Sequence, residues 1–159
     1  MPIDTPLCLY EGSIPPEWID YNGHMNVAYY VLAFDHATDG LMDYLGMDEA
    51  YRQRTQCSAF VLEAHINYRQ ELVEGDPIAC TTQLLGFDSK RVHFFHRMYH
   101  REENFLAATT EILLLHVDLG QRRSASMPRD MLDRLEMTMT RHIQLPRPPE
   151  AGRRIGIPK

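Results

Sequence analysis

Hydrophobic side chains change their spacing along this chain, and each spacing predicts a different element. Between residues 27 and 45, apolar side chains recur every three or four positions, at Tyr30, Phe34, Ala37, Leu41 and Tyr44. This is the spacing of one face of an α-helix. The first half of the stretch is apolar at almost every position, which is typical of a helix enclosed by the rest of a domain. We therefore expect a long buried helix over residues 27–45, with Asn26 as its N-cap and Gly46 closing it.

Apolar and polar residues alternate from residue 57 to 117, which favours β-strands. In the first strand the alternation places one apolar set on a single face, namely Phe60, Leu62, Ala64, Ile66 and Tyr68. Polar turns interrupt the pattern at three places. They divide the region into four strands, over residues 57–69, 78–87, 91–100 and 105–117.

Shorter elements flank this region. A strand is expected over residues 7–14, stopped by Pro15 and Pro16, and a helix over residues 128–137. Consecutive strands joined by short turns form an antiparallel sheet. The sequence thus predicts an α+β fold, with a curved antiparallel sheet wrapped around one long helix. We expect a single domain over residues 1–145, then a Pro- and Arg-rich tail over residues 146–159, either loose or laid over another subunit.

Composition narrows the functional classes. The formal net charge of -6 argues against a general nucleic-acid binder, and no apolar run approaches the roughly 20 residues of a membrane span. Three cysteines without a CxxC pair, and no signal-peptide pattern at the N-terminus, predict a cytoplasmic protein with reduced thiols. Of His93, His96 and His100 only the last two share a strand face, so we expect neither a metal site nor a cofactor.

The chemically informative segment comes directly before the long helix. Asp20 precedes a turn containing Gly23 and His24, and Asn26 and Val27 then open the helix. The first N–H groups of a helix lack internal partners and lie at its positive end, so they can stabilise a negative oxygen. Asp20 would lie close to the same point, where a carboxylate can attack a carbonyl or activate water. The alternative is a capping turn without chemistry, because such residues are common at helix starts.

The motif Asp20-x-x-Gly23-His24-x-Asn26, followed by Tyr30, resembles the signature of the 4-hydroxybenzoyl-CoA thioesterase family of hot-dog proteins. Tyr68 and Gly75-Asp76 extend the resemblance, which covers about residues 7–137. It implies the hot-dog fold and an acyl-CoA substrate. It also implies Asp20 as nucleophile or general base, and the backbone N–H of Val27 as the group that binds the thioester carbonyl. By the same resemblance, Gly23, His24, Asn26 and Tyr30 surround the substrate.

The residues after Asp20 depart from the founding branch of the family. That branch has Pro-Ala-Gly, whereas this chain has Tyr21-Asn22-Gly23-His24, so the 4-hydroxybenzoyl substrate does not carry over. The segment is instead similar to thioesterases of carnitine breakdown, which implies betainyl-CoA. A trimethylammonium group prefers aromatic faces and an anion. Glu63 is the candidate anion, and the candidate aromatic faces are Trp18, Tyr21, Tyr29, Tyr30 and Phe34. The alternative is that these aromatic residues simply fill the core.

The resemblance also implies a homodimer or homotetramer. Glu63 and His65 share the polar face of a strand that lies near the subunit interface in hot-dog proteins. They could reach a partner's active site or simply form a solvated face. Two other functions remain open, a thioesterase acting on acyl carrier protein and a hot-dog protein that binds acyl-CoA without catalysis. Neither a nucleic acid nor a membrane is expected as a partner.

Overall fold

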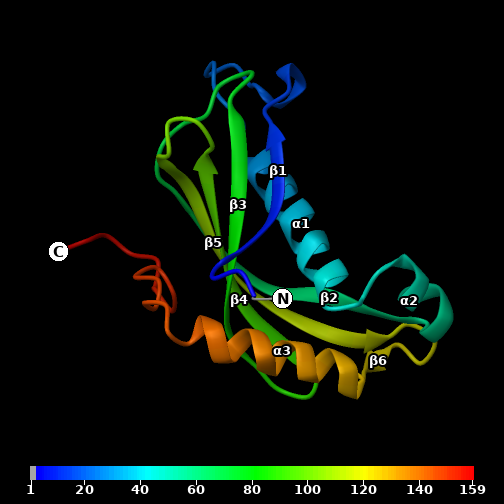
Figure 1. The fold of residues 1–159 in the computed structure, drawn as a ribbon. Coiled ribbons are helices and arrows are strands. Elements are labelled where there is room, and N and C mark those ends of the chain that lie inside the picture. The colour runs from blue at the N-terminus through cyan, green and yellow to red at the C-terminus, as the bar shows by residue number, and fades with distance from the viewer. Residues whose placement is uncertain (1–2) are drawn as a thin grey trace.

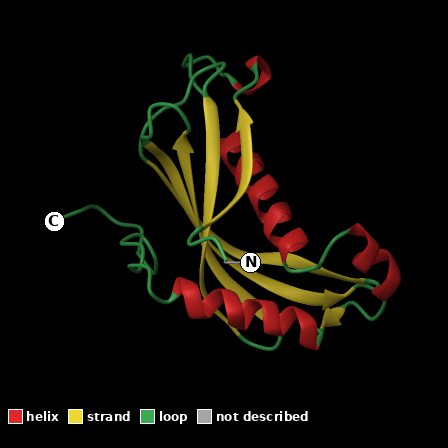
Figure 2. Cartoon of the chain, in the orientation of Figure 1, coloured by secondary structure: helices red, strands yellow, loops and turns green. Residues whose placement is uncertain are grey.

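The computed structural model describes residues 3–159 and contains one curved antiparallel sheet, three α-helices and one short 3-10 helix (Pro16–Trp18) (Figures 1 and 2). The strand order is β1-β3-β4-β5-β2, and β6 pairs with β5. The strands are β1 (Leu7–Ser13), β2 (Cys57–Tyr68), β3 (Pro77–Phe87), β4 (Arg91–His100), β5 (Leu106–Asp118) and β6 (Arg123–Ser124). The helices are α1 (Val27–Tyr44), α2 (Glu49–Thr55) and α3 (Arg129–His142). No helix in residues 3–159 combines the length and hydropathy of a membrane span.

The predicted architecture is confirmed, because the sheet bends around α1, which lies on its concave side (Figure 1). The helix begins where expected, with the side chain of Asn26 accepting a hydrogen bond from Ala28 N. The sequence pattern did not predict α2 or β6, which are short. It also ended the last helix too early. Buried contacts extend α3 beyond residue 137, since Thr138 bonds to Tyr44 Oη at 2.7 Å and His142 Nδ1 accepts from Leu84 N at 2.9 Å.

α1 packs on β3 and β4 through a buried histidine. The His96 ring stacks on Phe34, with ring centroids 6.0 Å apart. The Thr38 hydroxyl donates to Phe34 O, so it must accept from His96 Nε2, 3.0 Å away. His96 Nδ1 is then the acceptor for the Thr82 hydroxyl at 2.9 Å. The ring is neutral and both its nitrogens are satisfied, so it joins α1 to the sheet without a buried charge.

One side of α1 is not enclosed, contrary to the expectation from its apolar sequence. Val27, Val31 and Leu32 are 55%, 50% and 38% exposed. α1 covers only part of the concave face, and the surface of β2 and β5 next to these residues stays open within one chain. An apolar face left open in this way is typical of a surface that another chain covers.

A bulge in β2 changes which residues face α1. The pairing register between β2 and β5 shifts between Val61 and Glu63. Val61 therefore lies on the concave face with Ala64 and Ile66, while Phe60 turns to the other face. Strict alternation in the sequence placed Phe60 on the same face as Ala64, because alternation cannot anticipate an extra residue in one strand.

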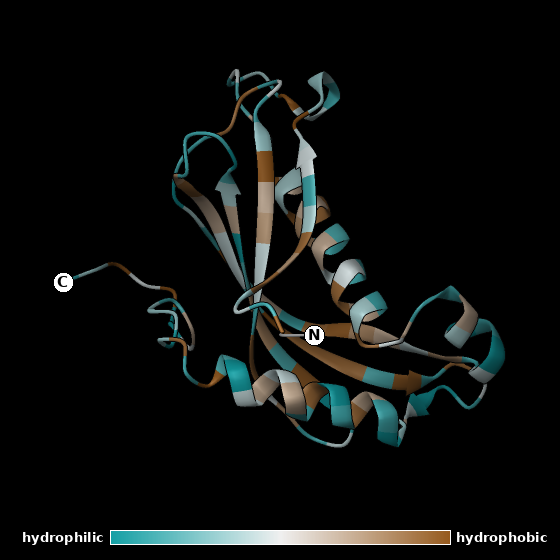
Figure 3. Ribbon diagram, in the orientation of Figure 1, coloured by the Kyte–Doolittle hydropathy of each residue, from teal (hydrophilic) through white to brown (hydrophobic). Residues whose placement is uncertain are grey.

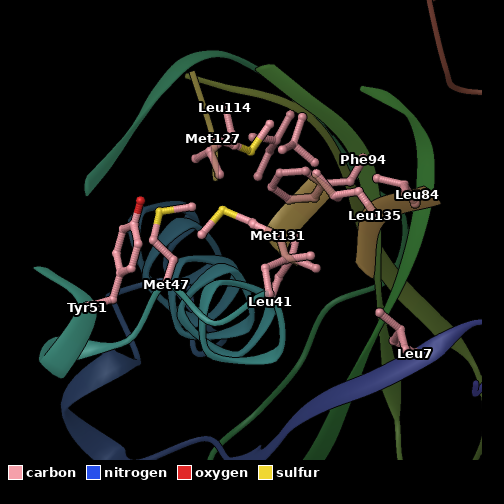
Figure 4. Close-up of a cluster of buried hydrophobic side chains, with 13 residues drawn as sticks. Leu7, Leu41, Met47, Tyr51, Leu84, Phe94, Leu114, Met127, Met131 and Leu135 are labelled. Carbon is pink, nitrogen blue, oxygen red and sulfur yellow. The ribbon is translucent and has the colours of Figure 1, made fainter. Parts of the chain in front are cut away.

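The far end of α1 packs against α3 and the α2 segment. Leu41 of α1 lies in one buried cluster with Met47, Tyr51, Met131 and Leu135 (Figure 4). Hydrophobic and hydrophilic residues alternate along α3, as expected for a helix with one face on the core (Figure 3). This cluster fixes the C-terminal half of α1, whereas the loop that carries Asp20 holds its N-terminal end.

As far as residue 153 the tail crosses the convex face of its own sheet. A contact of the tail with another subunit stays a prediction. Pro146 O accepts from Gln83 Nε2 at 3.2 Å, and Glu150 pairs with Arg69 at 2.6 Å. Gly152 N then donates to Glu111 Oε1 at 2.7 Å. Residues 154–159 are exposed.

The buried His96 predicts a pH-dependent stability. Burial lowers its pKa from 6.5 to about 3, so between these values the unfolded chain binds a proton that the folded chain does not. The free energy of unfolding should then fall as the pH is lowered through this window, by up to about 1.4 kcal/mol per pH unit for one proton. Urea unfolding from pH 7 to pH 4 measures this slope.

The variant His96→Gln should be less stable and should show a smaller slope. Some slope should remain, because burial also lowers the pKa of His142. His65→Gln, which removes a ring from an open cavity, should keep the wild-type slope. Equal slopes for His96→Gln and the wild type would contradict the neutral buried ring.

Candidate active site

A tight loop positions Asp20. Ile19 and Met25 form an isolated antiparallel bridge, Asp20 N donates to His24 O at 3.2 Å, and Gly23 N donates to Asp20 O at 3.0 Å. Gly23 has a φ of 78°, a left-handed conformation that favours glycine. The requirement for Gly23 is therefore conformational, because this φ lets the chain reverse within four residues.

The loop that carries Asp20 is also hydrogen-bonded to the rest of the domain. Met25 N donates to Leu72 O at 2.8 Å, and Asn26 N donates to Trp18 O at 2.9 Å. The Met25 side chain is fully buried. These contacts fix the loop against the segment after β2, so Asp20 keeps a constant position relative to the start of α1.

Two donors hold the Asp20 carboxylate. Asn22 N donates to Oδ1 and Asn26 Nδ2 donates to Oδ2, both at 2.8 Å. The bond from Asn22 N and then the bond from Asn26 lower the pKa of this carboxyl below its ordinary value of 3.8. The group is partly exposed. It is therefore ionised at neutral pH, oriented, and accessible to a ligand.

The helix start beside Asp20 presents one free donor. Asn26 Oδ1 accepts from Ala28 N at 2.9 Å, and Tyr29 N donates to Asn26 O at 3.0 Å. No acceptor in residues 3–159 bonds to Val27 N. This N–H lies at the positive end of α1. A carbonyl oxygen there would gain a hydrogen bond and a favourable field, and the negative oxygen of a tetrahedral intermediate would gain more.

A cavity of about 200 Å³ opens beside this helix start. Its walls come from the loop, α1 and the end of β2, with His24, Met25, Val27, Tyr30, Tyr68, Arg69, Gln70 and Glu71. Tyr30 and Tyr68 meet edge to face with their ring centroids 5.1 Å apart. Tyr68 Oη donates to Val27 O at 3.3 Å. His24 Nδ1 donates to Met25 O at 3.1 Å, which leaves Nε2 as an acceptor. We call this space the helix-start cavity.

A second, apolar groove of about 420 Å³ runs along α1 between the helix and strands β2 and β5. It is lined mainly by Ala28, Val31, Leu32, Phe34, Val61, Ala64, Ile66 and Ile112. Asp35 is its one charged residue, and the Thr110 hydroxyl on its wall has no hydrogen-bond partner in residues 3–159. The groove begins at the first turn of α1, close to Val27.

The structure does not bring Glu63 and His65 to Asp20. Both line a third cavity of about 800 Å³, together with His93, Glu111 and Arg153. His93 Nε2 contacts Glu111 Oε2 at 2.7 Å. Glu111 of β5 lies opposite His65 of β2 in the strand register, and both residues are on the convex face. Within one chain this cavity lies on the opposite face of the sheet from α1. A contribution of Glu63 and His65 to a partner's site stays a prediction.

The candidate aromatic residues lie in different surroundings within one chain. Trp18 and Tyr29 stack on each other at 5.5 Å, Phe34 stacks on His96, and Tyr21 is 96% exposed. Only Tyr30 of that set lines the helix-start cavity. In the sequence, Tyr68 was identified only as part of the family resemblance, and Glu71 was not identified. Tertiary folding brings both residues to the helix start from more than 40 positions away, so no local pattern signals them.

The three strand histidines have separate partners. His96 bonds to two threonines in the core. His93 pairs with Glu111, and His100 Nε2 lies 3.4 Å from Asp76 Oδ1. No group of three metal-binding side chains occurs in the described part of the chain.

Sequence comparisons agree with the motif. Residues 14–135 match the family described as the Thioesterase-like superfamily. A betainyl-CoA thioesterase of Pseudomonas aeruginosa is 43% identical over 152 residues, which cover 96% of each chain. An L-carnitine dehydrogenase/betainyl-CoA thioesterase of Rhizobium meliloti is 34% identical over 95% of this chain, although the match spans only 30% of that longer protein.

Solved structures share the fold over nearly the whole chain. A Staphylococcus aureus protein in complex with CoA has a TM-score of 0.89 and 25% identity, with 99% of this chain and 100% of that chain covered. A Pseudomonas putida protein assigned as a thioesterase has a TM-score of 0.83 and 36% identity, with 100% and 99% covered. The tail on the convex face lies within both matches.

Proposed function

This chain belongs to the thioesterase-like superfamily and is an acyl-CoA thioesterase, and we propose that betainyl-CoA is its substrate and Asp20 its central carboxylate. The observation that carries the role of Asp20 is its position. A single side chain, Asn26, bonds to the carboxylate and caps the helix whose first N–H is free. The substrate is inferred from the relative of Pseudomonas aeruginosa, which matches over 96% of both chains.

In the proposed mechanism the thioester carbonyl lies between Val27 and Asp20. Val27 N–H donates to the carbonyl oxygen and stabilises its negative charge in the tetrahedral intermediate. Asp20 either attacks the carbonyl carbon, forming an anhydride that water then hydrolyses, or takes a proton from an attacking water. In both routes a C–O bond forms, the C–S bond breaks, and CoA leaves as a thiolate that takes up a proton. None of these steps needs a metal or a redox cofactor.

We place this activity in carnitine breakdown. In the Rhizobium meliloti relative, one protein carries the names of both L-carnitine dehydrogenase and betainyl-CoA thioesterase. As part of the same proposal, the protein works in the cytoplasm. Its three free cysteines fit a reducing compartment.

We also propose that the protein is a homodimer or homotetramer with β2 at a subunit interface. β2 is an edge of the sheet, so its outer backbone groups are available to pair with a second β2. Phe60, Val61 and Leu62 on this strand are exposed, as are Val31 and Leu32 on the adjacent face of α1. A second copy paired there would cover both surfaces and close the groove along α1.

Light scattering at micromolar concentration should give the mass of two or four chains. The variant Val31→Glu should lower it to the monomer mass, because a charge would have to be buried in the interface. Met137→Glu is the matched control, since Met137 is exposed on α3 and should not affect assembly. A wild-type monomer would contradict the proposed interface.

The variant Asp20→Asn should reduce kcat for thiol release by two or more orders of magnitude, while the fold and CoA binding persist. Thiol release from betainyl-CoA, and from short, long and aromatic acyl-CoA controls, measures this effect. Near-normal turnover of Asp20→Asn would rule out the role of the carboxylate. A wild type that hydrolyses the controls better than betainyl-CoA would overturn the substrate alone.

Asn26→Ala tests the same carboxylate by its pKa. This variant keeps Asp20 but removes a donor to its ionised form, so the pKa of Asp20 should rise and the acidic limb of the kcat profile should move to higher pH. Loss of the N-cap should also cost about 1 kcal/mol of stability. Asn22→Ala is the matched control, because Asn22 bonds to Asp20 through its backbone N–H. An unshifted limb in Asn26→Ala would contradict the assignment.

A further inference from the structure

The helix-start cavity contains an accessible aromatic ring and an unpaired carboxylate at the same wall. Tyr68 is 47% exposed, and Tyr30, against which it packs, is buried. No residue in the described chain forms a hydrogen bond or ion pair with the Glu71 carboxylate, which is exposed. Tyr30 and Glu71 line the same cavity. Burial is the main cause of the raised pKa of Tyr30, and the charge of Glu71 adds to it.

The charges around this cavity sum to a negative environment. Arg69 is its one permanent cation, and the guanidinium group pairs with Glu150 at 2.6 Å. Tyr68 faces the concave side with Val27 and Tyr30, whereas this ion pair belongs to the tail on the convex side. The Glu71 carboxylate lies on the wall of this cavity, and the Asp20 carboxylate is bonded to the N-cap of α1. The Tyr68 ring beside them presents the negative face of its π-system.

Both the groove and the helix-start cavity begin near Val27, so the position of the carboxylates selects the helix-start cavity for a betainyl group. Its quaternary ammonium lies one methylene from the thioester carbonyl, so a carbonyl held at Val27 N places the cation within a few ångströms of Val27. Val27 itself lines the helix-start cavity. Asp35, the acidic residue of the groove, is eight residues along α1, or roughly 12 Å from Val27 at 1.5 Å per residue. It is too distant to meet that cation.

The positive end of α1 makes a nearby anion necessary. A helix N-terminus disfavours a cation, yet the same N-terminus must hold the carbonyl next to it. A carboxylate on the far side of the ammonium offsets this repulsion. Glu71 is the carboxylate on the wall of this cavity, and an aromatic face adds an attraction that a neutral acyl group does not receive.

We propose that Tyr68 and Glu71 recognise the quaternary ammonium of the acyl group and determine the preference for a cationic acyl-CoA. The inference rests on the proposed function, because it takes the acyl carbonyl to lie at Val27. It assigns specificity to two residues that do not take part in the bond changes. A cavity of about 200 Å³, small beside the 300–1,000 Å³ of a drug-sized site, suits an acyl group of a few heavy atoms.

The test compares betainyl-CoA with 3,3-dimethylbutyryl-CoA, in which carbon replaces the charged nitrogen at the same shape. We expect the wild type to favour betainyl-CoA in kcat/KM. In Tyr68→Leu and in Glu71→Gln, the ratio of the two kcat/KM values should fall by roughly tenfold, with most of the change in the KM for betainyl-CoA. Turnover of the neutral thioester should change much less.

Two controls separate charge recognition from general damage. Tyr68→Phe keeps the ring and loses only the bond to Val27 O, so the ratio should stay near the wild-type value. Glu74→Gln removes an exposed carboxylate from the nearby turn, outside the cavity, and should leave both thioesters unaffected. Circular dichroism checks that each variant is folded. Glu71→Gln keeps the test valid if Tyr68→Leu does not fold.

The outcomes distinguish this inference from the proposed function. A lower ratio in both Tyr68→Leu and Glu71→Gln supports the inference. A wild type that prefers betainyl-CoA, with the ratio unchanged in both variants, overturns the inference and leaves the substrate in place. Equal hydrolysis of the two thioesters by the wild type overturns both the inference and the betainyl-CoA substrate. Absence of thiol release from every acyl-CoA would overturn the proposed function itself.

Discussion

The side chain of Asn26 connects a loop to a helix, and the geometry of the candidate site depends on that connection. Its oxygen caps α1 through Ala28 N, and its nitrogen holds the Asp20 carboxylate. Because one amide makes both bonds, the carboxylate and the free Val27 N–H cannot move independently. The loop bonds to Trp18 and Leu72 then fix this unit to the end of the sheet. The proposed catalytic carboxylate and the proposed oxyanion donor are thereby preorganised before any substrate arrives.

The two faces of the curved sheet carry different residues and make different contacts. The concave face holds α1 through neutral packing and the His96 hydrogen bonds, and it leaves an apolar groove and an exposed helix face beside the edge strand. The convex face carries the polar residues of β2 and the tail. Glu150 and Gly152 bind Arg69 and Glu111 there. The tail pairs Arg69 through Glu150, whereas the Glu71 carboxylate on the wall of the helix-start cavity has no ion-pair partner in the described residues.

The sequence predicted what local periodicity and capping determine. The start of α1 at Val27, the Asn26 cap and the β4 bounds follow from apolar spacing, cap chemistry and turn residues. It could not predict the bulge at Val61, which depends on pairing with β5, or the extension of α3 to His142, which depends on contacts with Leu84 and Tyr44. In the site, the motif identified Asp20 and its loop. The positions of Tyr68 and Glu71 beside the helix start could not be predicted, because they depend on the tertiary fold, which brings the end of β2 to the start of α1.

The most direct test of the account is a crystal structure with a non-hydrolysable betainyl-CoA analogue, in which a methylene group replaces the thioester sulfur. The account predicts the carbonyl oxygen about 2.7–3.2 Å from Val27 N, the carbonyl carbon facing the Asp20 carboxylate, and the ammonium against the Tyr68 ring. A carbonyl bound away from Val27, for example in the cavity that contains Glu63 and His65, would contradict it.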